Sequence, residues 1–299
     1  MKSAIEQAIK EKIKALAKEQ EVTFAELWRN LILERFLTRL AYSPYRKKFV
    51  LKGGTLLAKY IPIGRETQDL DFFIQKLSNS KESLKTVLNA ICNIDANDSF
   101  AFEVSKINIL DHSQLIYTGA EIILLAKFGA TVTVVRIDLG FGDRVEPIEY
   151  PFNLTTTSKG PLFESKISLH CYPKEFIFAE KLETVIFRGA GNTRMKDFHD
   201  LYSLIRLNVL DDSLAGKAIE LVFQHRKTSL KKLPIVFGKD AFETLEKNWS
   251  AYRRKFKSKK SFLELPKLIE DVISILNQWL VDLSLEDSKK RKTPEFSEV

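Results

Sequence analysis

The sequence predicts an α/β protein with a mixed N-terminal part and a helical C-terminal part. Up to about residue 172, short runs of β-branched and aromatic residues alternate with stretches of helical periodicity. From Pro173 onward the apolar residues recur at helical spacing only. With 44% apolar residues among 299, the chain can bury one large core or two moderate ones.

Residues 1–45 are expected to form N-terminal helices. Thr23 and Glu26 have the spacing of a capping box, and apolar residues follow at helical intervals, which predicts a helix over about 24–40. An earlier helix is expected over about 5–18.

Residues 46–172 are expected to form the α/β core. The pattern predicts strands over 48–51, 69–75 and 131–139, the last closed by Gly140. Gly53 and Gly54 predict a tight turn that opens a short helix over 55–60. A further helix is expected over 82–92.

Residues 173–285 are expected to form a helical C-terminal domain, followed by a charged tail over 286–299 that we expect to be disordered. The apolar spacing predicts helices over 175–187, 196–206, 214–224, 237–256 and 263–283.

The excess positive charge of the chain is local. Residues 225–260 contain twelve Lys or Arg and three acidic residues, whereas the whole chain carries a net charge of +8. Because Tyr252, Phe256 and Phe262 interleave with these charges, the stretch is either a nucleic-acid-binding surface or a solvated helix face. The candidate RNA-binding residues are Arg226, Lys227, Lys231, Lys232, Arg253, Arg254, Lys255 and Lys257.

Composition also bounds the cellular setting. The two cysteines, Cys92 and Cys171, are too few for a disulfide framework or a zinc site and are expected to be core thiols. The N-terminus lacks the apolar centre of a secretion signal, and no apolar run is long enough to span a membrane. We therefore expect a cytoplasmic protein with no membrane partner.

Asp69 and Asp71 are the first candidate site residues. An acid pair two residues apart arises readily by chance, so its context must supply the specificity. This pair lies on a predicted strand, where side chains two apart point the same way. Two carboxylates on one spot repel each other unless a cation lies between them, and Mg²⁺ prefers carboxylate and phosphate oxygens. The pair therefore suits a complex of Mg²⁺ with a nucleoside triphosphate.

The segment Gly53-Gly54-Thr55 offers a phosphate site. Glycines let backbone N–H groups approach phosphate oxygens, and the following helix directs its positive end there. A third carboxylate is expected for two-metal chemistry, and Asp138 is favoured over Asp143 because it lies on a strand. The alternative for Asp138 is a strand-end residue that caps a turn before Gly140.

These residues, in this order, resemble the AbiEii/AbiGii toxin group, nucleotidyltransferase-like toxins of bacterial abortive-infection and type IV toxin–antitoxin pairs. The resemblance runs from about residue 50 to residue 204. It rests on the following set: Gly53-Gly54-Thr55, Arg65, Asp69-Leu70-Asp71, Ile137-Asp138, Gly142-Asp143, Ala179 to Leu182, Arg188, Arg194, Lys196-Asp197 and Asp200-Leu201.

The resemblance implies a polymerase-β-like nucleotidyltransferase fold with a mixed sheet, and it makes Asp69 and Asp71 metal ligands. It further implies that Lys181 contacts the triphosphate and that Asp197 completes the catalytic set. Some relatives add nucleotides to the 3′ end of tRNA. A cognate antitoxin encoded nearby is implied too, with direct contact left open.

The residues themselves leave alternatives open in the helical part. Lys181 lies on an apolar helix, so its ammonium group either reaches water or forms an ion pair with a buried anion. Asp197 and Asp200 either belong to the site or complement a helix dipole. The basic residues that could neutralise phosphates are Arg65, Arg188, Arg194 and Lys196. His199 is expected to be a packing or surface residue.

The function expected is that of a Mg²⁺-dependent nucleotidyltransferase toxin, which transfers a nucleotide from an NTP to RNA, foremost a tRNA 3′ end. Catalysis is assigned to Asp69, Asp71, Asp138, Lys181 and Asp197, with the metal on the first three. Nucleotide binding is assigned to Gly53, Gly54, Thr55, Arg65, Arg194 and Lys196. The alternatives are modification of a protein hydroxyl by nucleotidylation or phosphorylation, and a non-catalytic NTP- or nucleic-acid-binding module.

Overall fold

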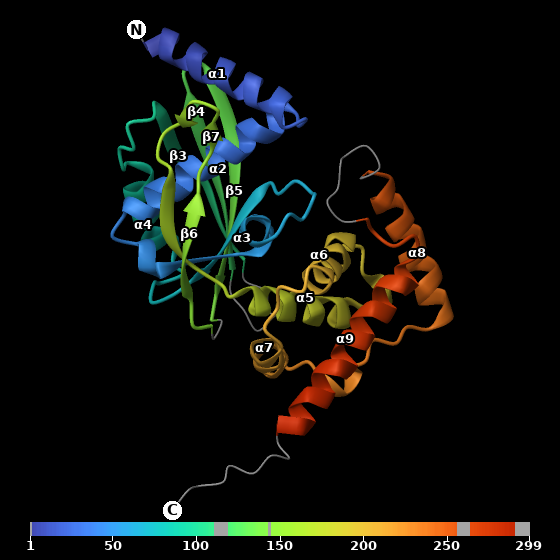
Figure 1. The fold of residues 1–299 in the computed structure, drawn as a ribbon. Coiled ribbons are helices and arrows are strands. Elements are labelled where there is room, and N and C mark those ends of the chain that lie inside the picture. Colours follow the sequence, from blue (N-terminus) through green and yellow to red (C-terminus); the bar gives the residue numbers. More distant parts are fainter. Residues whose placement is uncertain (1, 111–118, 143–144, 256–263, 291–299) are drawn as a thin grey trace, which may run out of the picture. The chain divides into compact units, whose positions relative to one another are not determined.

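The computed structural model describes residues 2–110, 119–142, 145–255 and 264–290. The chain divides into two compact units, shown by their elements in Figure 1. The first, which we call the sheet unit, consists of Met1–Lys59 and Glu66–Tyr172. The second, the helical unit, consists of Tyr60–Arg65 and Pro173–Val299.

The sheet unit contains a seven-stranded mixed sheet with the strand order β3-β4-β5-β2-β1-β9-β6. The pairs β2/β5 and β1/β9 are parallel and the other pairs are antiparallel. The strands are β1 (Phe49–Lys52), β2 (Asp69–Ile74), β3 (Phe100–Leu110), β4 (Gly119–Phe128), β5 (Thr131–Phe141), β6 (Ile148–Asn153) and β9 (Lys166–Cys171), and a separate ribbon is formed by β7 (Thr156–Thr157) and β8 (Gly160–Pro161).

The helices of the sheet unit are α1 (Lys2–Glu19), α2 (Phe24–Tyr42), α3 (Gly53–Tyr60) and α4 (Lys81–Cys92), with a short 3₁₀ turn, η1 (Arg46–Lys48). Helix α2 begins where the sequence predicts, since the Thr23 hydroxyl accepts a hydrogen bond from the Glu26 backbone N–H at 3.1 Å.

Helix α2 crosses the sheet in Figure 1 and packs against one of its faces. Trp28 of α2 contacts the rings of Phe100 and Phe128, and Phe36 contacts Phe102. These rings belong to the buried core. We call this the helix-covered face of the sheet.

The opposite face we call the open face. Along β5, Val135, Ile137 and Leu139 are buried, whereas the alternate residues Arg136 and Asp138 are exposed. Because side chains alternate across a strand, the exposed set of β5 points to the open face.

Two details of the core differ from the prediction. Gly53 and Gly54 are the first residues of α3 itself rather than a separate turn. Strand β5 continues through Gly140 to Phe141, so Asp138 lies within the strand and caps no turn. The alternative interpretation of Asp138 is therefore wrong.

The helical unit contains α5 (Lys174–Arg188), α6 (Met195–Arg206), α7 (Asp212–His225), α8 (Lys239–Arg254) and α9 (Ile269–Lys290), with 3₁₀ turns η2 (Gly189–Gly191) and η3 (Leu230–Lys232). Its core includes a T-shaped contact between Phe178 of α5 and Trp279 of α9, with ring centroids 4.8 Å apart. None of the helices that the structure describes combines the length and apolar content needed to cross a bilayer.

Helix α9 differs from its predicted limits at both ends. It begins at Ile269 rather than near residue 263, since Pro266 cannot donate a helical hydrogen bond and its carbonyl accepts one from the Trp249 indole at 3.1 Å. It continues to Lys290, so the first residues of the predicted disordered tail are helical. Residues 291–299 lie outside the described part.

Candidate active site

Two of the three predicted metal ligands, Asp71 and Asp138, are neighbours on the open face of the sheet. Strands β2 and β5 are parallel neighbours, and their register sets Asp71 directly beside Asp138. Asp69 lies two residues earlier on β2, and Leu70 and Phe72 between and after the acids are buried. Since neighbouring strands are about 4.8 Å apart, Asp71 and Asp138 are adjacent acids on one surface.

This pair belongs to a row of polar residues that crosses five strands. Asn108 of β3 is paired with Glu121 of β4, Glu121 with Asp138, Asp138 with Asp71, and Asp71 with Lys52 of β1. The Asn108 amide donates to the Glu121 carboxylate at 3.0 Å. We call these five residues the acid row.

Gly53 brings the start of α3 against Asp71. Its φ of +71° lies in the left-handed region that favours glycine. A Cβ at this position would lie 2.0 Å from Oδ2 of Asp71, so a side chain there would force the Asp71 carboxylate to move. The Asp71 carboxylate thus lies at the N-terminal turn of α3, where the helix dipole favours negative charge.

Thr55 has a structural role that the sequence did not indicate. Its side chain is buried, and its hydroxyl donates to the backbone carbonyl of Asp69 at 2.7 Å. The bond joins α3 to β2 at the acids. In this structure the Thr55 hydroxyl therefore donates its hydrogen bond to the backbone and not to a phosphate.

Lys52 brings a cation to the acid row. Its Nζ lies 5.0 Å from the centroid of the Tyr172 ring. It also lies 3.9 Å from the position that a Cβ on Gly140 would take. The ammonium group of Lys52 therefore lies beside Gly140 of β5, on the face that carries Asp71 and Asp138.

The carboxylate oxygens of the acid row are donors of the type that a hard divalent cation prefers. Mg²⁺ is commonly held by one or two carboxylates together with substrate phosphates, and Asp71 and Asp138 supply adjacent carboxylates. Within the described ranges, no three His, Cys, Asp or Glu side chains form a group that could hold a metal ion by themselves. Substrate oxygens would complete the ligands, as Mg²⁺ sites of this kind require.

The helical unit holds the other predicted residues in one buried ion cluster. Lys181 of α5 lies 2.8 Å from Asp197 and 2.8 Å from Asp200, both of α6. Arg65 binds Asp200 through two nitrogens, at 2.8 and 2.6 Å, and Arg194 Nε donates to Asp197 at 2.8 Å. Of the two alternatives for Lys181, the structure shows that its ammonium group pairs with buried anions.

Charge and burial explain the pKa directions in this cluster. Burial would raise the pKa of Asp200, but Lys181 and Arg65 outweigh it and hold the pKa well below its ordinary value. Burial would likewise lower the pKa of Lys181, and the charges of Asp200 and Asp197 raise it instead. The cluster has three cations and two anions, so it keeps a positive charge that favours an anionic ligand.

His199 lies beside the cluster as a packing residue, as expected. It is 1% exposed, and its Nδ1 lies 2.8 Å from the Tyr252 hydroxyl. Burial lowers the pKa of His199 to about 4, so the ring is neutral at neutral pH. Tyr252 also stacks on Trp249, so its ring packs inside the protein and is not available to stack on a nucleobase.

Of the basic residues that could neutralise phosphates, Arg188, Arg194 and Lys196 are exposed. The Arg194 side chain is 44% exposed although its Nε is bound to Asp197, so the rest of its guanidinium is accessible. Arg65, by contrast, is 8% exposed and fully engaged with Asp200. Its expected contact with a nucleotide would require that pair to open.

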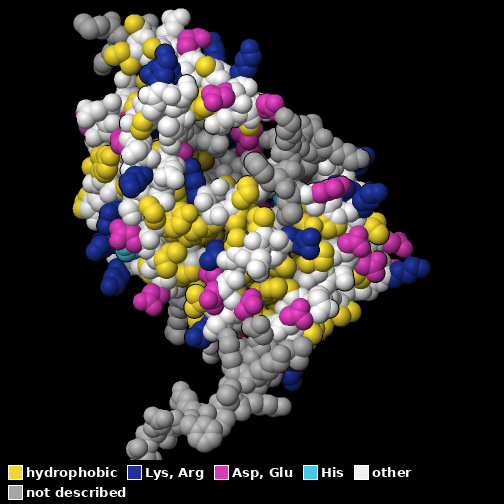
Figure 2. Space-filling view, viewed as in Figure 1, with side chains coloured by type: hydrophobic (Ala, Val, Ile, Leu, Met, Phe, Trp, Pro, Cys, Tyr) yellow, Lys and Arg dark blue, Asp and Glu magenta, His cyan; other side chains and the backbone are white. Residues whose placement is uncertain are grey.

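The basic stretch is not uniformly available to a polyanion. Arg226 lies 2.8 Å from Glu183 and 3.4 Å from Glu180, so these internal salt bridges already neutralise its charge. The Arg253 guanidinium donates to the Lys267 carbonyl at 3.2 Å. Exposed members are Lys227, Lys231, Lys232, Arg254 and Lys255, whereas Lys257, Phe256 and Phe262 lie outside the described residues. On the face in view in Figure 2, Lys and Arg side chains are dispersed among acidic ones.

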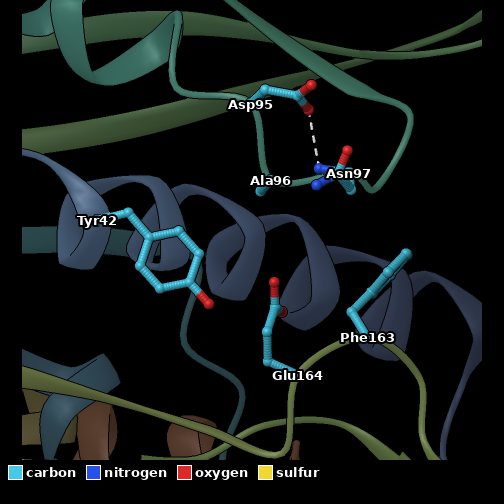
Figure 3. A pocket seen from close by; sticks show the side chains of 6 residues that line it. All are labelled: Tyr42, Asp95, Ala96, Asn97, Phe163 and Glu164. Carbon is cyan, nitrogen blue, oxygen red and sulfur yellow. Dashed lines mark hydrogen bonds between the residues drawn. The ribbon is translucent and has the colours of Figure 1, made fainter.

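A separate hollow of about 340 Å³ lies on the helix-covered side of the sheet unit and is drawn in Figure 3. Tyr42, Glu164 and Phe163 line it, together with the segment Asp95–Asn97, in which the Asp95 carboxylate accepts from the Asn97 backbone N–H. It contains none of the predicted site residues.

Comparison with known proteins identifies the family. Residues 35–271 match the family model described as nucleotidyl transferase AbiEii toxin of type IV toxin–antitoxin systems. The chain belongs to this AbiEii family. As an AbiEii protein it is a nucleotidyltransferase, which implies a nucleoside triphosphate as substrate and an antitoxin as partner. Nucleotidyltransferases of this kind generally use divalent metal ions.

Solved structures with similarity to this AbiEii chain include two from Helicobacter pylori. JHP933 is 17% identical, with 90% of this chain and 96% of that chain covered and a TM-score of 0.47. A putative nucleotidyltransferase is also 17% identical, with 90% and 98% covered and a TM-score of 0.46. The Elizabethkingia meningoseptica CdnE cyclic dinucleotide synthase, with GTP and Apcpp, is 10% identical, with 84% and 89% covered and a TM-score of 0.25. No curated protein matches the sequence.

Sequence reasoning missed several residues of this site. Asp200 was left without a role, yet it binds both Arg65 and Lys181. Its spacing of three from Asp197 on one helix was the available signal. Lys52 and Glu121 were also missed, since their places in the acid row depend on strand order and register.

Proposed function

We propose that this AbiEii protein transfers a nucleotide from a Mg²⁺-bound NTP to the 3′ hydroxyl of an RNA, foremost the 3′ end of a tRNA. The observation that carries the proposal is the register of Asp71 beside Asp138, next to the glycine start of α3. Bound Mg²⁺ would stabilise the charge that develops on the attacking and leaving oxygens.

The sheet-unit residues have the following roles in this proposal. Asp71, with Asp69, holds the metal-bound triphosphate, and the backbone N–H groups at Gly53 and Gly54 approach its phosphate oxygens. Asp138, which is exposed, orients the attacking 3′ hydroxyl. A bond forms between the 3′ oxygen and the α-phosphorus, the bond to the pyrophosphate oxygen breaks, and the hydroxyl proton passes to solvent.

The helical-unit residues have an electrostatic role. Asp197 holds Lys181 and Arg194 in position, and the net positive charge of their cluster would favour a phosphate-bearing ligand. Lys196 is exposed on the same helix and would add to this positive charge. The RNA body would contact the exposed lysines of the basic stretch, such as Lys231 and Lys232.

The test uses purified protein, Mg²⁺, each α-labelled NTP separately and total cellular RNA, analysed on a denaturing gel. We expect label in an RNA of tRNA size with one NTP, and none with Asp138→Asn. Asp95→Asn is the matched control, since Asp95 is an exposed aspartate of the same unit on the helix-covered side. Label in protein instead of RNA, or equal labelling by the Asp138 variant, would overturn the proposal.

A further inference from the structure

A second polar row lies beside the acid row on the open face. Lys106 of β3 is paired with Ile123 of β4, Ile123 with Arg136 of β5, and Arg136 with Asp69 of β2. We call Lys106, Ile123 and Arg136 the basic row. It runs parallel to the acid row, because Arg136 and Asp138 are two residues apart on one strand.

Both cations of the basic row are exposed. Among the residues that the structure describes, no salt bridge joins either of them to an acid. This distinguishes them from other cations of the same face, such as Lys127, which lies 2.6 Å from Glu103. Cations that form no internal salt bridge can bind an external anion.

Apolar side chains continue the surface away from the acids. Val134, two residues before Arg136 on β5, is 50% exposed, and its partner on β4 is Leu125. Val132, next along the same face of β5, is 55% exposed. The open face therefore presents carboxylates, then cations, then an apolar strip.

From this order we infer that the basic row and the adjoining apolar strip bind the acceptor strand of the RNA. A strand rises about 3.3 Å per residue, so the Cα atoms of Arg136 and Asp138 are about 7 Å apart along β5. An RNA whose 3′ hydroxyl is at Asp138 would thus have its nearest phosphates at Arg136 and Lys106. The base or ribose of the preceding nucleotide would pack on Val134 and Leu125.

The positive charge of the basic row is complementary to the phosphates of RNA, which is why we infer that RNA binds there. The acids of the neighbouring row repel phosphates unless cations lie between, so an acceptor strand needs fixed positive charge beside them. The basic row supplies this charge next to Asp138. The inference rests on the proposed function, and it assigns the reacting end of the acceptor to the sheet unit rather than to the basic stretch.

The experiment measures RNA binding directly. A fluorescein-labelled tRNA is titrated with the full chain without NTP, and anisotropy is followed over a range of salt concentrations. We expect Arg136→Ala and Lys106→Ala each to weaken binding several-fold and to reduce the log–log salt slope by about 0.7. In the double variant the salt slope should fall by about 1.4. Lys127→Ala, whose charge is already paired on the same face, should bind as the parent does.

Two further readouts keep the result unambiguous. In the transfer reaction Arg136→Ala should raise the KM for RNA and leave the KM for NTP unchanged. Thermal unfolding checks that both variants fold, as expected for exposed positions. Unchanged RNA affinity and slope in the double variant would overturn the inference, as would an equal loss in Lys127→Ala. Because binding is measured without turnover, failure of the transfer reaction alone would overturn the proposed function instead.

Discussion

The contact between Gly53 and Asp71 gives a sharp prediction for Gly53→Ala. An alanine Cβ would lie 2.0 Å from Oδ2 and 2.5 Å from Cγ of Asp71, whereas ordinary contact begins at 3.4 Å. The carboxylate would have to withdraw by more than roughly 1 Å. A displacement of about 1 Å in a reacting group can cost about 100-fold in rate. The left-handed backbone at Gly53 adds about 1–2 kcal/mol of destabilisation for alanine.

We therefore expect Gly53→Ala to melt a few degrees lower and to lose at least about 100-fold in nucleotide transfer. The assay is incorporation of α-labelled NTP into RNA, with thermal unfolding of the same preparation. Gly238→Ala is the control, because nothing lies within 4 Å of its Cβ position and its φ of −69° suits alanine. A folded Gly53→Ala protein with full activity would refute the placement of Asp71 in the site.

Three other outcomes follow from buried groups. His199, whose pKa is lowered to about 4 by burial, stays neutral in the folded protein while the unfolded chain takes up a proton below about pH 6.5. Urea unfolding should therefore show up to about 3 kcal/mol of stability lost as pH falls from about 6.5 to about 4, and His199→Gln should flatten this loss. Asp98→Asn should cost about 3–5 kcal/mol in the same measurement, because it removes the counter-charge of the buried Arg39 and one of the two counter-charges of Arg35, while Asp95→Asn should change stability little. Arg226→Ala should lower stability by about 1–3 kcal/mol and leave RNA affinity unchanged, because Arg226 is bound to Glu183; a loss of RNA affinity with unchanged stability would contradict its internal role.

The local structure was largely predictable from the sequence because periodicity and capping are local signals. The helix that starts after Thr23 and the strand that carries Asp69 and Asp71 lie where the pattern predicts. Cys92 and Cys171 are buried free thiols, as expected. The limits of α9 were wrong because the apolar spacing continues across Pro266, where the backbone leaves the helix.

The site could be predicted only in part, because its other residues are brought together by register and by tertiary pairing. No pattern in the sequence states that β2 and β5 are parallel neighbours, and this pairing is what sets Asp138 beside Asp71. The pairing of Arg65 with Asp200, 135 residues apart, is equally invisible in the chain order. Thr55 and Arg226 looked like ligand-binding residues because a side chain's type does not tell which internal partner it has.

The most direct measurement is a double-mutant cycle of nucleotide transfer with Asp71→Asn, Asp138→Asn and the double variant. If both carboxylates hold the same metal-bound substrate, each single change should reduce the rate almost as far as both together. Losses that simply multiply in the double variant, or near-normal transfer in either single one, would contradict a shared site on the open face.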